Sequence, residues 1–374
     1  MTDKPFRVLS LDGGGIRGLY TASLLQQLTL RFAKYHGINT DKSLDLGGQF
    51  DLIVGTSTGS ILAAALAAGV PLENVLNLYR TKAADIFQLP MPLQRGCFGD
   101  KSRAALWALR NLFSSANKSE SLRDALQSVL NEETVGQLYQ RRGIALCIPS
   151  IDAETRRAWV FKTPHLKRLT RDDNYKLVDV CMASAAAPIY FPMHVIPSPN
   201  HGVNVGHAFV DGGLWANNPV MVALVEALEV AEPNQEIEIL SVGTGGASPS
   251  QVLHENQTKR GSWQWKGGAD IVATSLEAQA YATPYLAKQI AKAIGNRITL
   301  HRLQDPQPSS DEAGHLSLDA ADSKSLAVLE TLGQRATDLN FSALTNPVAP
   351  SAELEMAKRI FSNIQQIQGG SNGV

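Results

Sequence analysis

The pentapeptide Gly55-Thr56-Ser57-Thr58-Gly59 is the feature that most constrains how this chain can fold. It follows an apolar run at residues 50–54 and precedes another at residues 60–66. A strand that turns this sharply into a helix needs glycines around the turn, because larger side chains would clash with neighbouring backbone. The pattern therefore predicts a strand–serine–helix unit in which Gly55 and Gly59 support an exposed Ser57 hydroxyl at the helix N-terminus.

Strand-like and helix-like segments alternate along the chain. Residues 19–35 carry apolar side chains at helical spacing, and residues 178–185 are expected to form a packed helix. The segments with the composition of strands are 6–11, 50–54, 144–148, 159–161, 207–210 and 237–242. This alternation predicts an α/β fold with a mainly parallel central sheet and helices on both faces.

A second glycine-rich turn, residues 12–18 (Asp-Gly-Gly-Gly-Ile-Arg-Gly), follows the first expected strand. It fits the G-x-G-x-x-G pattern of dinucleotide-binding folds, which also calls for an acidic residue about twenty positions later at the end of a second strand. The next clear strand ends in the serine turn instead. Glycine amides at a helix N-terminus can alternatively stabilise a developing oxyanion. The nearby serine favours this role for Gly13, Gly14 and Gly15, with Arg17 adding positive potential.

A serine nucleophile needs a base. The late histidines available for a Ser-His-Asp arrangement are His254, His301 and His315. None of them follows a strand in a glycine-rich turn, whereas Asp211 does, with Gly212 and Gly213 after it. Such a turn allows close approach to another strand end, as a direct Ser-Asp dyad requires. The alternative is that Asp211 caps the helix expected at Pro219 or stabilises its own turn.

Composition excludes several classes of function. A formal net charge of −1 gives no basic excess for binding a nucleic acid polymer. No apolar run approaches the roughly 18 residues that a membrane-spanning helix needs. Cys97, Cys147 and Cys181 form neither a metal-binding pattern nor an even disulfide set. Because residues 1–5 lead directly into a strand, we expect no signal peptide and a cytoplasmic protein.

In chain order, the motifs at residues 12–18, 55–59 and 211–213 resemble those of the patatin-like phospholipases. The resemblance extends through residues 183–192 and covers about residues 6–340. Three ordered motifs are specific, although any one alone is not. The resemblance implies a three-layer α/β core with a mainly parallel sheet, helices on both faces and a helical cap.

The same resemblance implies a lipid acyl hydrolase that uses neither a metal nor another cofactor. Ser57 would be the nucleophile, and Asp211 the base. The glycines implied as oxyanion-hole donors are Gly13, Gly14 and Gly15, and the supporting residues are Arg17, Gly55, Gly59, Gly212 and Gly213.

We expect two parts along the chain. Residues 1–345 would form the hydrolase domain, with residues 83–140 as a cap or insertion because they are Pro- and Gly-punctuated and then helical and polar. Residues 346–374 would add a C-terminal helix and a frayed Gly/Ser-rich tail.

Some bacterial members of the family resemble this chain in being short and cytosolic with an extra helical insertion, and they act as antiphage effectors switched on by a cyclic dinucleotide. The basic residues that are candidates for such a phosphate site are Arg95, Lys101, Arg103, Arg141 and Arg142. A solvated basic face is the alternative for these residues. The rival functions are a constitutive lipase or general esterase and a nucleotide-binding protein that uses the loop at residues 12–18.

The expected substrate is membrane phospholipid at a bilayer surface, which would place the active protein peripherally on the inner membrane. Residues 86–93 and 263–265 are apolar stretches that could serve as lid or interfacial elements or pack beneath their own loops. A cyclic dinucleotide is the candidate activator, and a homo-oligomer is the candidate assembly.

Overall fold

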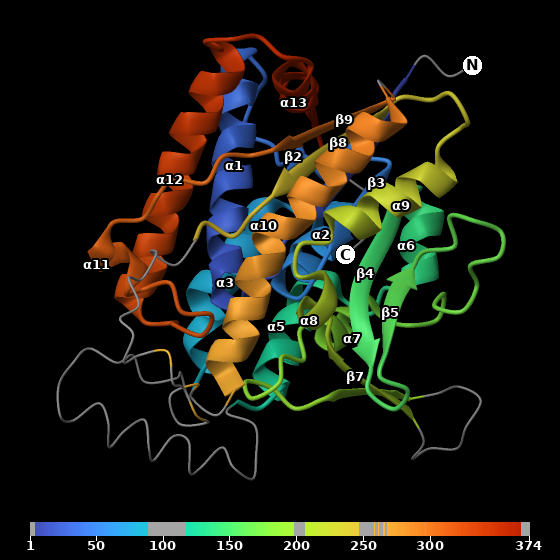
Figure 1. Ribbon diagram of the computed structural model, residues 1–374, viewed down its shortest axis with the longest axis vertical. Helices are drawn as coiled ribbons and strands as arrows, with labels where there is room; N and C mark the ends of the chain where they lie inside the picture. The colour runs from blue at the N-terminus through green and yellow to red at the C-terminus, as the bar shows by residue number, and fades with distance from the viewer. Residues whose placement is uncertain are drawn as a thin grey trace.

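The computed structural model describes residues 4–88, 117–197, 206–246, 258, 261, 265, 268–295 and 297–367 (Figure 1). The strands are β1 (Phe6–Leu11), β2 (Leu44–Asp45), β3 (Leu52–Gly55), β4 (Ala145–Asp152), β5 (Arg157–Lys162), β6 (His194–Pro197), β7 (Gly206–Asp211), β8 (Ile237–Val242), β9 (Ile298–Arg302) and β10 (Gln365–Gln366). The helices are α1 (Gly18–Tyr35), α2 (Thr58–Ala68), α3 (Leu72–Ile86), α5 (Glu120–Leu130), α6 (Val135–Arg142), α7 (Leu177–Ser184), α8 (Gly213–Ala216), α9 (Val220–Val230), α10 (Ala269–Ile294), α11 (Ser310–Ala313), α12 (Ser323–Thr345) and α13 (Ala352–Ser362). Short 3-10 turns cover η1 (Gly15–Arg17) and η2 (Gly47–Gln49).

One large sheet organises the molecule, with strand order β6-β7-β4-β3-β1-β8-β9 and with β5 also paired to β4. The five strands from β4 to β9 in this order are parallel, whereas β5, β6 and β7 are antiparallel to their neighbours. The predicted mainly parallel α/β fold is therefore confirmed. Because the carboxyl ends of β1 and β3 lie at the same edge, the two glycine-rich turns that follow them meet there.

Helices cover both faces of the sheet. On one face, Leu9 and Leu11 of β1 join a core made with α1, α2 and α7. On the other face, Val8 packs in a second core with α9 and with Ala287 of α10. In Figure 1, α9 and α10 cross in front of the sheet, and α1 and α12 stand to the left. The two cores follow from the alternation of side chains along buried parallel strands.

The structure also shows elements that were not expected, since β9, α10 and α12 lie where no strand or helix was predicted. The segment predicted as a cap contributes the end of α3 and the helices α5 and α6, while residues 89–116 lie outside the described residues. Helix α13 buries Met356, Ile360 and Phe361 in the same core as α1. No helix in the described ranges is long and apolar enough to cross a membrane.

Candidate active site

Ser57 sits at the turn between β3 and α2 in a strained conformation. Its φ of 54° and ψ of −124° lie in a region that L-residues rarely adopt. A Cβ added to Gly55 would lie 2.1 Å from the carbonyl oxygen of Gly59, and one added to Gly59 would lie 2.4 Å from that of Leu11. Only glycine fits at both positions, so the turn has the tight geometry that the pentapeptide predicts.

Asp211 ends β7 and faces Ser57. Ser57 Oγ donates a 2.7 Å hydrogen bond to Asp211 Oδ2, and the N–H of Gly213 donates a 2.6 Å bond to Oδ1. Both side chains are buried. Burial raises the pKa of Asp211 to about 6, although the two hydrogen bonds act in the opposite direction. A carboxylate with this pKa is mostly ionised at neutral pH and is a stronger base than an ordinary aspartate.

The loop that follows β1 lies against the serine. Gly14 and Gly15 line the same pocket as Ser57 and Asp211, and no hydrogen bond from either amide is found within the part of the chain that the structure describes. The amide of Gly13 instead donates a 2.8 Å hydrogen bond to the carbonyl of Asn217. Gly14 and Gly15 are therefore the available donors of this loop, and the inclusion of Gly13 does not fit its observed bonding.

The supporting residues hold the backbone around the two site residues. The N–H of Gly212 donates to the carbonyl of Ser184, and Gly213 begins α8. Arg17 is buried behind the loop, where its guanidinium donates to the carbonyl of Gly246 at 3.2 Å and to that of Gly14 at 3.4 Å. It lines a neighbouring polar cavity with Asp12 and Arg302, so its charge acts on the loop from behind.

Gln279 is a site residue that the sequence did not reveal. It projects from α10, and its Oε1 accepts a 2.8 Å hydrogen bond from the N–H of Asn217. Its Nε2 donates at 3.1 Å to the carbonyl of Gly213. Gln279 therefore ties α10 to the turn in which the N–H of Gly213 donates to Asp211. A single glutamine in an alanine-rich helix gives no local signal of such a role.

The pocket around Ser57 and Asp211 is apolar. Its walls come from α2, α3, α5, the α7–β6 connection, α8 and α10. The apolar residues among them include Ile61, Leu78, Ile86, Phe87, Leu122, Phe191, Leu214, Val272 and Leu276. No histidine is among the lining residues that the structure describes. His301 lies in β9, His315 contacts Ser325, and His254 lies outside the described residues. This arrangement brings Ser57 together with a carboxylate rather than an imidazole.

Several other sequence candidates lie away from the pocket or beyond the described residues. Arg141 pairs with Glu133, and Arg142 with Asp45, so both guanidinium groups are engaged in ion pairs. Arg95, Lys101 and Arg103, residues 89–93, Trp263 and Gln264 are outside the described residues. Phe87 packs edge-on against Phe191 with ring centroids 5.7 Å apart, so it is a wall of the pocket.

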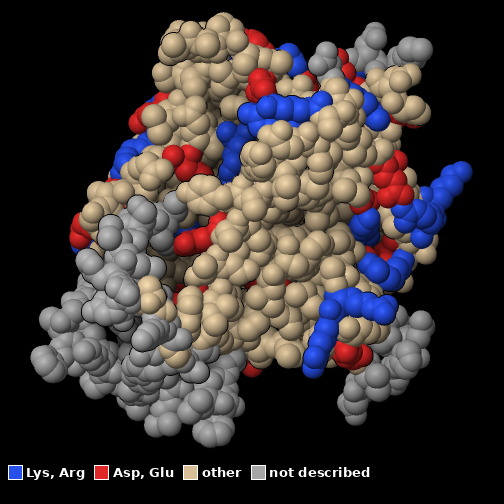
Figure 2. Space-filling view, in the orientation of Figure 1, with Lys and Arg blue, Asp and Glu red and all other residues tan. Residues whose placement is uncertain are grey.

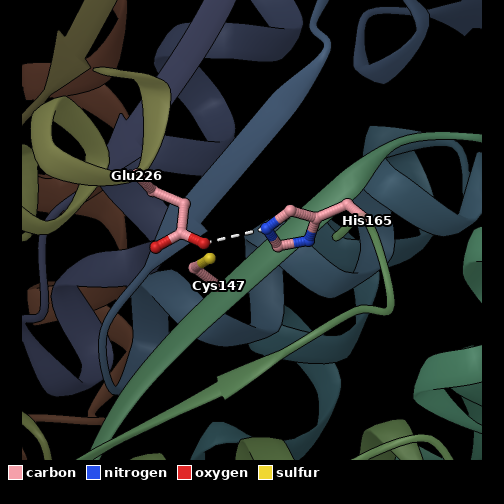
Figure 3. A group of neighbouring side chains, drawn as sticks. All are labelled: Cys147, His165 and Glu226. Carbon is pink, nitrogen blue, oxygen red and sulfur yellow. Dashed lines mark hydrogen bonds and ion pairs between the residues drawn. The ribbon is translucent and has the colours of Figure 1, made fainter. Parts of the chain in front are cut away.

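A buried group of Cys147, His165 and Glu226 has the residue types of a metal site, with ligand atoms within 4.8 Å of one another (Figure 3). His165 Nε2 lies 2.9 Å from Glu226 Oε1, and Lys162 forms an ion pair with the same carboxylate. Burial raises the pKa of the Cys147 thiol well above its usual range, which disfavours the thiolate that binds metals. These contacts fit an ion cluster that joins α9 to the β4–β5 hairpin.

The chain is similar to a known protein family, to named proteins of that family and to solved structures. A family model described as patatin-like phospholipase matches residues 9–224. The chain is 31% identical to a cGAMP-activated phospholipase of Escherichia coli, over 91% of each chain. It is 33% identical to a protein of the same name from Vibrio cholerae, over 90% of this chain and 91% of the relative. Among solved structures, it is similar to human GIVD cytosolic phospholipase A2, with 11% identity, a TM-score of 0.44 and coverage of 95% of this chain and 60% of that one.

Proposed function

The chain belongs to the patatin-like phospholipase family and is an ester hydrolase, and we propose that it releases fatty acids from membrane phospholipids through a Ser57–Asp211 dyad. The observation that supports this most directly is the 2.7 Å hydrogen bond from Ser57 Oγ to a buried carboxylate in an apolar pocket. An apolar pocket with few polar groups suits an acyl chain whose only reactive group is its ester.

The proposed reaction proceeds in two halves. Ser57 Oγ attacks the ester carbonyl carbon while Asp211 accepts the hydroxyl proton, and the amides of Gly14 and Gly15 stabilise the tetrahedral oxyanion. Collapse breaks the ester C–O bond, and the departing alkoxide takes the proton from Asp211, which leaves an acyl-serine. Water then gives a proton to Asp211 as it attacks the acyl carbon, and the fatty acid leaves when Ser57 regains that proton.

The test is fluorophosphonate labelling beside fatty-acid release from phospholipid vesicles. Ser57→Ala should abolish both, and Asp211→Asn should lower release by about three orders of magnitude or more, because it removes the base. Ser342→Ala, an exposed serine on α12, is the matched control and should behave as the parent. A folded Ser57→Ala protein that still releases fatty acid would refute the dyad. Absent labelling together with a rise in Tm on adding NAD or FAD would favour the nucleotide-binding alternative.

We further propose that a cyclic dinucleotide switches the enzyme on, as the names of the relatives at 31% and 33% identity state for those proteins. The size of the pocket supports a requirement for activation. Its cavity holds about 80 Å³, which is smaller than a cavity of about 150 Å³ that binds benzene. We expect activation to widen this pocket so that it admits an acyl chain. In antiphage defence, such gating would keep host lipids intact until a signal arrives.

Fatty-acid release with and without cGAMP tests the gating. We expect release to rise when cGAMP is added and not when other cyclic dinucleotides are added at the same concentration. Equal release under all conditions would assign the protein as a constitutive lipase.

A further inference from the structure

Helix α10 presents an apolar face to the outside of the molecule. Its exposed large hydrophobic residues, each at least 37% exposed, include Ile271, Tyr281, Tyr285, Leu286 and Ile290, and these five define what we call the α10 face. The opposite side of the helix packs Ala287 and Ala291 into the core under the sheet. Large apolar side chains that are left exposed on one face of a helix mark an interaction surface rather than random exposure.

The charged residues of α10 lie along one margin of this face, in the stripe that also holds Tyr281. Asp270, Glu277, Lys288 and Lys292 are spaced seven, eleven and four residues apart, which places all four along one edge of the helix, beside Tyr281. The residues between the large apolar side chains on the face are small or uncharged: Ser275, Ala278, Ala282, Gln289 and Ala293. In Figure 2, uncharged side chains cover the centre of the view, where Figure 1 places α10, and Lys and Arg side chains border that area.

The α10 face is continuous with the active-site pocket. Val272 and Leu276, on the same helix, line the pocket that holds Ser57 and Asp211. Helix α8 packs against α10 and adds Leu214 to the pocket, while its neighbour Trp215 is 38% exposed. Apolar side chains therefore extend from the pocket wall along α10 to the outside of the molecule.

We propose that the α10 face is the surface on which the protein rests against a lipid bilayer. This inference rests on the proposed function, since such a face serves an enzyme whose substrate is embedded in lipid. Helices that lie in a bilayer interface bury an apolar face that includes large side chains and keep their charged residues to the side. Tyrosine is favoured at this depth because its ring is apolar and its hydroxyl stays hydrated. Lys288 and Lys292, at the edge of the face, would contact anionic head groups.

A bilayer fits the face better than a second copy of the chain does. An acyl chain that leaves the membrane avoids water only if apolar surface joins the bilayer to the pocket. The α10 face gives this connection when it is covered by lipid. A second copy seated on the same face would bury the apolar side chains but would leave the substrate without a dry path. The dimer is therefore the rival outcome of the test.

The binding experiment uses the Ser57→Ala protein, so that vesicles are not degraded. In this background, two double variants are compared. The α10 pair combines Tyr285→Glu with Leu286→Glu. The α12 pair combines Leu339→Glu with Val348→Glu, at exposed apolar residues on and just after α12. Co-sedimentation with vesicles of equal parts phosphatidylethanolamine and phosphatidylglycerol is measured with and without cGAMP. We expect the α10 pair to weaken binding by about tenfold or more and the α12 pair to leave it unchanged. Equal binding by both variants would overturn the proposal.

Two further measurements, made with Ser57 intact, separate the alternatives. The α10 pair should still hydrolyse a dissolved short-chain ester at the parent's rate but should release less fatty acid from vesicles. If the parent fails to hydrolyse the dissolved ester and to react with fluorophosphonate even with cGAMP present, the proposed function fails, whatever the vesicle binding. If sedimentation velocity shows that the α10 pair turns a dimer into a monomer while vesicle binding is retained, the face is a subunit interface and the docking proposal is wrong.

Discussion

Asp211 carries two requirements that conflict in a single carboxylate. In the proposed mechanism it must be ionised to accept a proton from Ser57, yet it is buried in a pocket that disfavours charge. The hydrogen bonds from Gly213 and Ser57 offset only part of that cost, so the pKa of Asp211 rises to about 6. The residue is thus ionised at neutral pH while its basicity is closer to that of an imidazole than to that of an exposed aspartate.

We expect kcat/KM on a dissolved ester to rise with pH and to level off above about pH 6, because only ionised Asp211 can accept the proton. The measurement is a pH profile on a water-soluble ester, which avoids changes in the charge of a membrane. A profile that is flat down to about pH 4 would contradict the proposal that a carboxylate with a raised pKa is the base.

At the scale of elements, α10 joins an exposed apolar face to the turn that follows Asp211. Its outer face carries the exposed apolar residues, and its inner side carries Gln279, which bonds to Asn217 and Gly213. The N–H of Gly213 in turn donates to Asp211. A displacement of α10 would therefore reach Asp211 through the two hydrogen bonds that Gly213 makes.

Gln279→Leu tests this connection, because leucine has a similar size but cannot bond to the turn. We expect kcat on a dissolved ester to fall by about tenfold, and the midpoint of the pH profile to move upward as the Gly213 bond to Asp211 loosens. Gln289→Leu, on the exposed side of the same helix, is the matched control. An unchanged midpoint with a lower Tm would reduce Gln279 to a structural role.

The meeting of Ser57 and Asp211 could be predicted from the sequence, because both positions are marked by backbone requirements. Gly55 and Gly59 are needed by close backbone contacts next to Ser57, and such glycines are visible in a sequence. The bond between Gly13 and Asn217 is not visible, since it depends on how two distant loops approach each other. Helix α10 was missed because it is rich in alanine, contains Pro284 and carries apolar residues on both sides, which weakens the helical periodicity.

At the scale of the whole molecule, the site reduces stability. The pKa of Asp211 in the folded protein, about 6, exceeds its ordinary value of 3.8. Between these values the folded protein binds the proton more tightly than the unfolded chain does, so stability falls as pH rises through this window. Above it, the ionised carboxylate costs the fold about 3 kcal/mol. The surrounding sheet and its two cores must supply that free energy.

Asp211→Asn should therefore stabilise the protein while it abolishes the reaction. Asparagine keeps a carbonyl oxygen for Gly213 but has no charge to bury, so we expect Tm at about pH 8 to rise by a few degrees. The difference should shrink toward zero at about pH 4, where Asp211 is protonated in the folded parent. Asp124→Asn, an exposed aspartate on α5, is the control for the loss of one negative charge. Equal Tm values for Asp211→Asn and the parent across this range would show that folding does not raise the pKa of Asp211, and the stated cost of burying its charge would be wrong.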